Sequence, residues 1–126
     1  MNAVDLCYLP ATELLDAYRA RRVSPVEVTR AVLERIERLN PTINAFVTVT
    51  ADRAMADALR AERAYAAGGD ISPIAGVPYS LKDLTPTKGI RTTRGSLLTK
   101  DWIPDFDVPI GERLRDAGGV LLGKTN

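Results

Sequence analysis

The residue with the clearest potential for chemistry is Lys82, in the segment 76–84 (GVPYSLKDL). If this segment is a strand, its apolar side chains share one face, and Ser80 and Lys82 share the other. A lysine amine that is withdrawn from water has a lowered pKa and can act as a base near neutral pH. The alternative is an edge strand with both polar side chains in water. Pro78 favours that alternative, because proline occurs at strand starts and sheet edges.

The absence of histidine restricts the chemistry further. The 126 residues include no histidine and a single cysteine, and the formal net charge is +1. A Ser-His-Asp triad, a Cys-His pair and a His-ligated metal cannot be built from these residues. Lysine is then the natural side chain for activating a hydroxyl group. We expect no metal, no cofactor and no attraction to nucleic acid from the overall charge.

A hydroxyl-rich segment, 85–96 (TPTKGIRTTRGS), follows Lys82. Asp83 cannot share a strand face with Lys82, so we expect it to hydrogen-bond the backbone where the strand ends, or to lend its charge to a site. The segment is either a surface loop tied by its own side chains or one wall of a pocket beside Lys82. In the second case the candidate pocket residues are Asp83, Thr92, Thr93, Gly95 and Ser96.

Helices are expected to precede this region. Thr12 can cap a helix over residues 13–22. Ser24 is followed by proline and, three residues later, by Glu27, which is the pattern of a capping box. Apolar residues at helical spacing continue this second helix as far as Asn40-Pro41, where we expect proline to stop it.

The remaining elements alternate between strands and helices. A helix over 107–117 should turn Ile110 and Leu114 inward. This order predicts the α/β class. The other expected elements are a strand over 43–49, a helix over 52–67, a strand within 76–84 and a strand over 120–122.

A phosphate-loop pattern occurs near the end of the sequence. Gly118, Gly123, Lys124 and Thr125 satisfy G-x-x-x-x-G-K-[ST]. A phosphate loop joins a strand to a following helix, whereas here a helix precedes the pattern and the variable positions are mainly apolar β-formers. Nucleotide binding is therefore a remote alternative.

Three segments together resemble the amidase signature family. They are 73–83 (PIAGVPYSLKD), 89–96 (GIRTTRGS) and 118–126 (GGVLLGKTN), and the helices over 11–69 resemble the family's N-terminal layer less specifically. The resemblance implies an α/β fold with a helical layer and the first strands of a mixed sheet, incomplete in this chain. Residues 1–126 would form the N-terminal portion of one amidase domain, with 1–70 mainly helical and 71–126 carrying strands, loops and the lysine motif.

The family resemblance also implies a mechanism. The family cleaves carboxylic amides with a Ser–cis-Ser–Lys triad, and Lys82 stands at the position of the triad lysine. The family's serines lie in a Gly-Gly-Ser-Ser-Gly-Gly run and a later Gly-Gly-Ser, and this sequence has neither run. We therefore expect an inactive chain whose partners are the remainder of the same polypeptide and a small amide substrate.

Two other functions remain open at this point. One is a portion of the glutamine-using subunit of a tRNA-dependent amidotransferase, for which tRNA would be a partner. The other is a noncatalytic interaction module, which would be stable, monomeric and inactive. An unpaired sheet edge favours association, so a homodimer is a further candidate. We expect no signal peptide, no membrane span and a cytoplasmic location.

Overall fold

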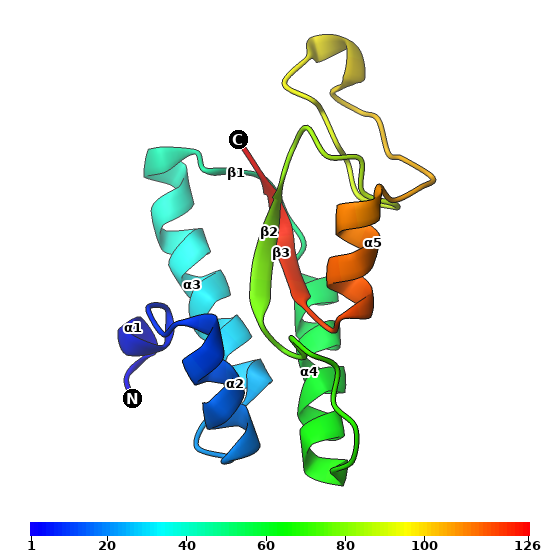
Figure 1. Ribbon diagram of the computed structural model, residues 1–126. Coiled ribbons are helices and arrows are strands. Elements are labelled where there is room, and N and C mark those ends of the chain that lie inside the picture. Colours follow the sequence, from blue (N-terminus) through cyan, green and yellow to red (C-terminus); the bar gives the residue numbers. More distant parts are fainter.

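The computed structural model describes residues 1–126 and has helices on both sides of a small central sheet (Figure 1). No helix is both long enough and apolar enough to cross a membrane. The elements in chain order are α1 (Ala3–Leu6), α2 (Ala11–Arg19), α3 (Pro25–Ile43), β1 (Phe46–Val49), α4 (Ala51–Ala67), β2 (Pro78–Lys82), a 3₁₀ helix (Leu97–Thr99), α5 (Pro109–Asp116) and β3 (Val120–Thr125).

The sheet is mixed, with strand order β1-β3-β2. The central strand β3 pairs antiparallel with β1 and parallel with β2. The α/β class and the mixed sheet predicted from the sequence are confirmed. β1 and β2 are both edge strands, and each has one side without a strand partner.

A β-bulge at Gly123 divides β3 into two registers. Tyr79 of β2 is opposite Leu121 of β3, and Leu81 of β2 is opposite Lys124 of β3. The chain therefore advances two residues along β2 but three along β3 between these pairs. The extra residue turns Lys124 to the face that carries Leu121 and Leu81. Only glycine fits at position 123, because a Cβ there would lie 2.1 Å from the backbone oxygen of Thr48.

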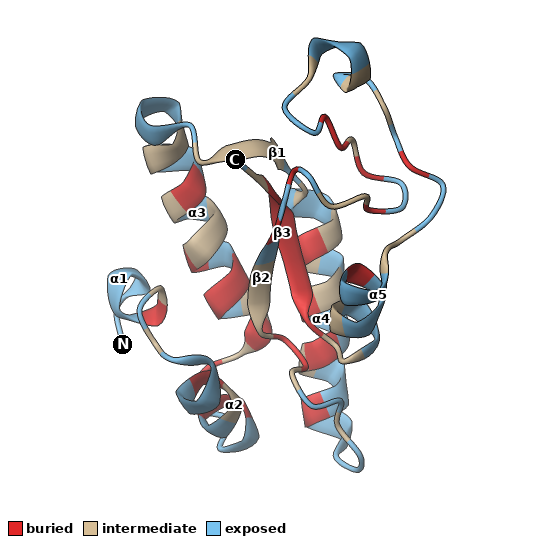
Figure 2. Ribbon diagram, turned by 45° about the horizontal axis from the view of Figure 1, so that its top comes forward, coloured by how far each residue is buried: buried red, intermediate tan, exposed pale blue.

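The two faces of the sheet are covered by different elements (Figure 2). Helices α3 and α4 pack on the face that carries Val120 and Leu122. The opposite face carries Leu81 and Leu121, which pack with Ile90 of the long loop and with α5. The side chains from α3 and α4 are Ile36, Ala54 and Ala58.

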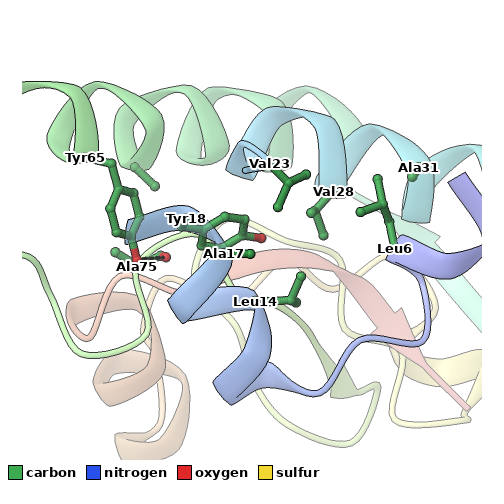
Figure 3. Close-up of a cluster of buried hydrophobic side chains, with 10 residues drawn as sticks. Leu6, Leu14, Ala17, Tyr18, Val23, Val28, Ala31, Tyr65 and Ala75 are labelled. Atoms are coloured by element: carbon green, nitrogen blue, oxygen red, sulfur yellow. Dashed lines mark hydrogen bonds between the residues drawn. The ribbon is translucent and has the colours of Figure 1, made fainter. Parts of the chain in front are cut away.

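A second apolar cluster anchors the segment that leads into β2 (Figure 3). Tyr18 of α2 and Tyr65 of α4 are both buried, with ring centroids 5.6 Å apart. The Tyr18 hydroxyl donates to the carbonyl of Gly76, and the Tyr65 hydroxyl donates to that of Ala75, each at 3.1 Å. The start of β2 is therefore held against the helical layer. A Cβ at Gly76 would lie 2.8 Å from Pro25, so the contact also requires glycine.

The structure confirms the capping box of α3 but corrects its end. The Ser24 hydroxyl accepts from the Glu27 backbone, and the Glu27 carboxylate accepts from the Ser24 backbone. The helix continues through Pro41 to Ile43 and ends where Asn44 takes a left-handed conformation. The side chain of Asn40 pairs with both backbone groups of Phe46, so the strand begins at 46 rather than 43.

Three smaller expectations about helices were wrong. α2 begins at Ala11 after Pro10, with no cap bond from Thr12. It ends at Arg19 because Arg21 takes a left-handed conformation. Ile110 of α5 is exposed rather than inward. The short helix α1, capped by the Asn2 side chain, was not predicted, because four residues are too few to show a period.

Candidate active site

Lys82 is the last residue of β2, on the open edge of the sheet. Its side chain is exposed, as is that of Ser80, while Leu81 between them is buried. The structure therefore matches the alternative of an edge strand with both polar side chains in water, because nothing pairs with the outer side of β2. The predicted alternation and the strand start at Pro78 are confirmed.

The Lys82 side chain lines a pocket of about 240 Å³ at the carboxyl ends of β2 and β3. Since β2 and β3 are parallel, their ends meet at one edge, which is where ligands usually bind in α/β folds. Asp83 and Gly95, both candidates from the sequence, also line it. Four lining residues were not predicted, and they are Leu84, Arg94, Thr125 and Asn126.

Asp83 fixes the exit from β2, as the sequence suggested. Its backbone N–H donates to the carbonyl of Thr125 at 2.6 Å, and its carbonyl accepts from Arg94 at 2.9 Å. Its buried carboxylate accepts from the backbone N–H of Thr93 at 3.1 Å and from the Thr93 hydroxyl. Asp83 thus joins the end of β2 to the loop that returns beside it.

The threonines of the loop are structural rather than pocket-lining. Thr92 and Thr93 are buried and do not contact the pocket. The backbone N–H of Gly95 donates to the Thr93 hydroxyl at 3.2 Å. The Ser96 hydroxyl accepts from Leu98 and caps the 3₁₀ helix, so it is also outside the pocket.

Lys124 was missed as part of this region. Its side chain is completely buried, and its Nζ donates to the carbonyl of Thr85 at 2.6 Å and to the hydroxyl of Thr92 at 2.9 Å. Burial lowers the pKa of this amine, while the nearby charge of Asp83 raises it. The bulge at Gly123, which directs the side chain inward, could not be read from residue spacing.

The position of Lys124 also contradicts the phosphate-loop alternative. The residue lies within β3, not in a loop that opens a helix, and its amine is already bonded inside the protein. No three His, Cys, Asp or Glu side chains lie close enough together in the structure to hold a metal ion.

Comparison with known proteins places these motifs in one family. The sequence model described as Amidase matches residues 27–126. The chain belongs to the amidase family. The matched region contains β2, Lys82, Asp83 and the whole threonine loop.

Similar proteins include both amidotransferase subunits and amidases. The chain is 47% identical over 123 residues to a glutamyl-tRNA(Gln) amidotransferase subunit of Geobacter sulfurreducens, covering 98% of this chain and 25% of that protein. It also resembles the peptide amidase of Stenotrophomonas maltophilia, with a TM-score of 0.86, 33% identity, and coverage of 94% of this chain and 25% of the amidase.

A bacterial aryl acylamidase of the amidase signature enzymes is a further structural neighbour, with a TM-score of 0.88 at 27% identity, covering 97% of this chain and 26% of that one. The resemblance to the amidase signature family seen in the sequence is confirmed, as is the fold it implied. The chain spans about a quarter of the length of these relatives.

Proposed function

We propose that this amidase-family chain contributes the proton-transferring lysine of an amide-hydrolysing site, and that this lysine is Lys82. The observation that carries the proposal is the state of its amine. The side-chain amine of Lys82 has no hydrogen-bond or ion-pair partner, whereas the side chains of Asp83 and Lys124 are both engaged. The amine lies at the rim of a pocket, and hydrogen bonds of the following turn hold its backbone in place. Because the amine has no partner of its own, it is available to an incoming hydroxyl.

The proposed reaction converts a carboxylic amide and water into a carboxylic acid and ammonia or an amine. The neutral Lys82 amine accepts a proton from a bridging serine, which takes one from the nucleophilic serine. The nucleophile attacks the amide carbonyl carbon, the carbon–nitrogen bond breaks, and the proton held at Lys82 returns to the leaving nitrogen. Water then attacks the acyl ester left on the nucleophilic serine and gives a proton to Lys82 through the bridging serine. The ester bond breaks, the carboxylic acid leaves, and the proton returns to the nucleophilic serine. Polypeptide that covers the pocket would withdraw the amine from water, which favours its neutral form.

In this proposal both serines come from polypeptide other than residues 1–126. Ser24 and Ser96 are engaged as helix caps, and neither family serine motif occurs in the sequence. The isolated chain should therefore release no ammonia from amides. Ammonia released above the blank from aliphatic or aryl amides would contradict this assignment.

A chimaera tests the role of Lys82 directly. The N-terminal quarter of the Geobacter sulfurreducens amidotransferase subunit is replaced by this chain, and ammonia release from glutamine is measured. Lys82→Ala should lower the rate by about 10²–10⁴-fold, the usual contribution of a general base. Lys100→Ala, at another exposed lysine, is the matched control and should leave the rate unchanged. Equal rates for the two variants would remove Lys82 from the mechanism.

A second candidate is the glutamine-using subunit of a tRNA-dependent amidotransferase. The 47% identity to an amidotransferase subunit favours it over the 33% identity to the peptide amidase. The chimaera that carries this chain should still form glutaminyl-tRNA together with the remaining subunits of that enzyme. In the control chimaera, the N-terminal quarter of the peptide amidase replaces the same region of the amidotransferase subunit. Equal transamidation by the two chimaeras would contradict this second candidate.

A further inference from the structure

We propose that Lys124 is a positioning residue, which holds the turn that carries the Lys82 amine. This inference rests on the proposed role of Lys82 but concerns a different residue. Lys124 does not line the pocket, so it would act through the backbone rather than on substrate.

Lys124 differs from the other lysines in its surroundings. Lys82, Lys88 and Lys100 are exposed, whereas Lys124 has no exposed surface. A buried ammonium costs free energy unless hydrogen bonds replace its water shell. Both bonds of the Lys124 Nζ go to the segment that follows Lys82, which concentrates its effect there.

The connection from Lys124 to Lys82 consists of two successive bonds. The Lys124 amine donates to the carbonyl of Thr85, and the backbone N–H of Thr85 donates to the carbonyl of Lys82 at 2.9 Å. The turn from 82 to 85 is thereby fastened to the central strand. Without the bond from Lys124, the carbonyl of Thr85 is no longer held, and the bond from the Thr85 N–H to the Lys82 carbonyl is weakened.

The same amine fastens the returning loop. It donates to the Thr92 hydroxyl, which in turn donates to the carbonyl of Ile90 at 3.1 Å. The next residue, Thr93, is held by Asp83. Lys124 and Asp83 therefore clamp the loop at two adjacent positions, both on the side of β2 opposite to Lys82.

The bulge in β3 is what makes the clamp possible. Without the extra residue at Gly123, alternation would turn Lys124 to the face covered by α3 and α4. Bulges commonly redirect a side chain beside an active site. The Lys124 side chain contacts the turn from the face of the sheet that carries Leu81, whereas the Lys82 side chain lies on the opposite face of β2.

The first test measures backbone amide exchange in the 126-residue chain. Lys124→Met should accelerate exchange at the Thr85 amide by about 10-fold, the effect of losing one hydrogen bond to a charged group. Lys88→Met, which removes an exposed lysine from the same loop, is the matched control. Unchanged exchange at Thr85 in Lys124→Met would overturn the clamp.

The second test separates positioning from folding in the chimaera described above. Lys124→Met should lower kcat by about 10²-fold with little change in KM, as a displacement of about 1 Å does. Thr92→Val should lower kcat in the same direction, and Thr92→Ser, which retains the hydroxyl, should restore it. A purely structural role would reduce the amount of folded enzyme and leave kcat per folded molecule unchanged.

The outcomes distinguish the two proposals. If Lys82→Ala abolishes turnover and Lys124→Met leaves kcat unchanged, the positioning role is wrong and the role of Lys82 stands. If Lys82→Ala retains turnover, the proposed function itself fails, and the exchange experiment still decides whether Lys124 holds the turn.

Discussion

Replacement of Gly123 by alanine should disrupt the sheet at the bulge beside Lys124. A Cβ at this position would lie 2.1 Å from the carbonyl oxygen of Thr48 and 3.0 Å from the Cα of Val49. Both contacts are backbone atoms of β1, so no side-chain rotation can relieve them. We expect β1 to shift away from β3, as the backbone does at overpacked sites.

The cost of Gly123→Ala can be worked out from these contacts. Overpacking at a tight site costs about 1–3 kcal/mol. The displaced strand also weakens the bond from the Thr50 backbone N–H to the carbonyl of Leu122, now 2.9 Å long, which adds about 1 kcal/mol. The free energy of unfolding should therefore fall by about 2–4 kcal/mol relative to the parent chain.

Urea unfolding monitored by circular dichroism is the appropriate assay, with Gly89→Ala as the control. Gly123 and Gly89 both have a positive φ, of 154° and 73°, but a Cβ at Gly89 meets nothing within 4 Å. Gly89→Ala thus carries only the backbone cost of a left-handed residue, about 1–2 kcal/mol. Equal losses in both variants would refute the close approach of β1 and β3 at the bulge.

The buried polar groups lead to three further predictions. Asp83→Ala should lower the free energy of unfolding by about 2–3 kcal/mol, because it leaves the Thr93 N–H buried without a partner; a loss under about 0.5 kcal/mol in urea titration would contradict this. Burial lowers the pKa of Lys124 in the folded chain below its unfolded value of 10.5. At pH values between the folded and unfolded pKa, the unfolded chain binds more protons, so the free energy of unfolding rises with pH there. The free energy of unfolding is measured against pH for the parent chain and for Lys124→Met, and the second curve is subtracted from the first. The tyrosines with raised pKa values contribute equally to both curves, so the difference should rise with pH. A difference that does not change with pH would contradict this prediction. Tyr18→Phe should cost about 1 kcal/mol through the lost bond to Gly76, with no loss in urea titration as the contrary result.

The local elements were largely predictable because their signals lie within a few residues. The capping box at Ser24 and the alternation that exposes Lys82 and buries Leu81 both depend on neighbours in the sequence. The point where helix α3 gives way to β1, beyond Asn40-Pro41, was not predicted from such neighbours. The Asn40 side chain bonds Phe46 beyond the helix, and such a bond forms only after the chain turns.

The site was predictable in part. The structural role of Asp83 at the strand exit could be derived from the alternation of side chains along the strand, whereas the motif around Lys82 was recognised only through its resemblance to the family. The burial of Lys124 could not, because it depends on the bulge at Gly123, and that bulge depends on the close approach of a strand more than 70 residues earlier. The sequence favoured exposure of Lys82 on an edge strand but left its withdrawal from water open, because burial of an edge strand depends on what lies beside it and not on its own residues.

The most direct measurement of the central claim is chemical rescue of the Lys82→Ala chimaera by added primary amines. If Lys82 transfers protons during amide cleavage, small alkylamines should restore part of kcat, with a rate that depends on the amine's pKa as general-base catalysis requires. Lys100→Ala should neither lose activity nor respond to amines. Full activity of Lys82→Ala without amines, or an inactive variant that no amine in the series restores, would contradict the account.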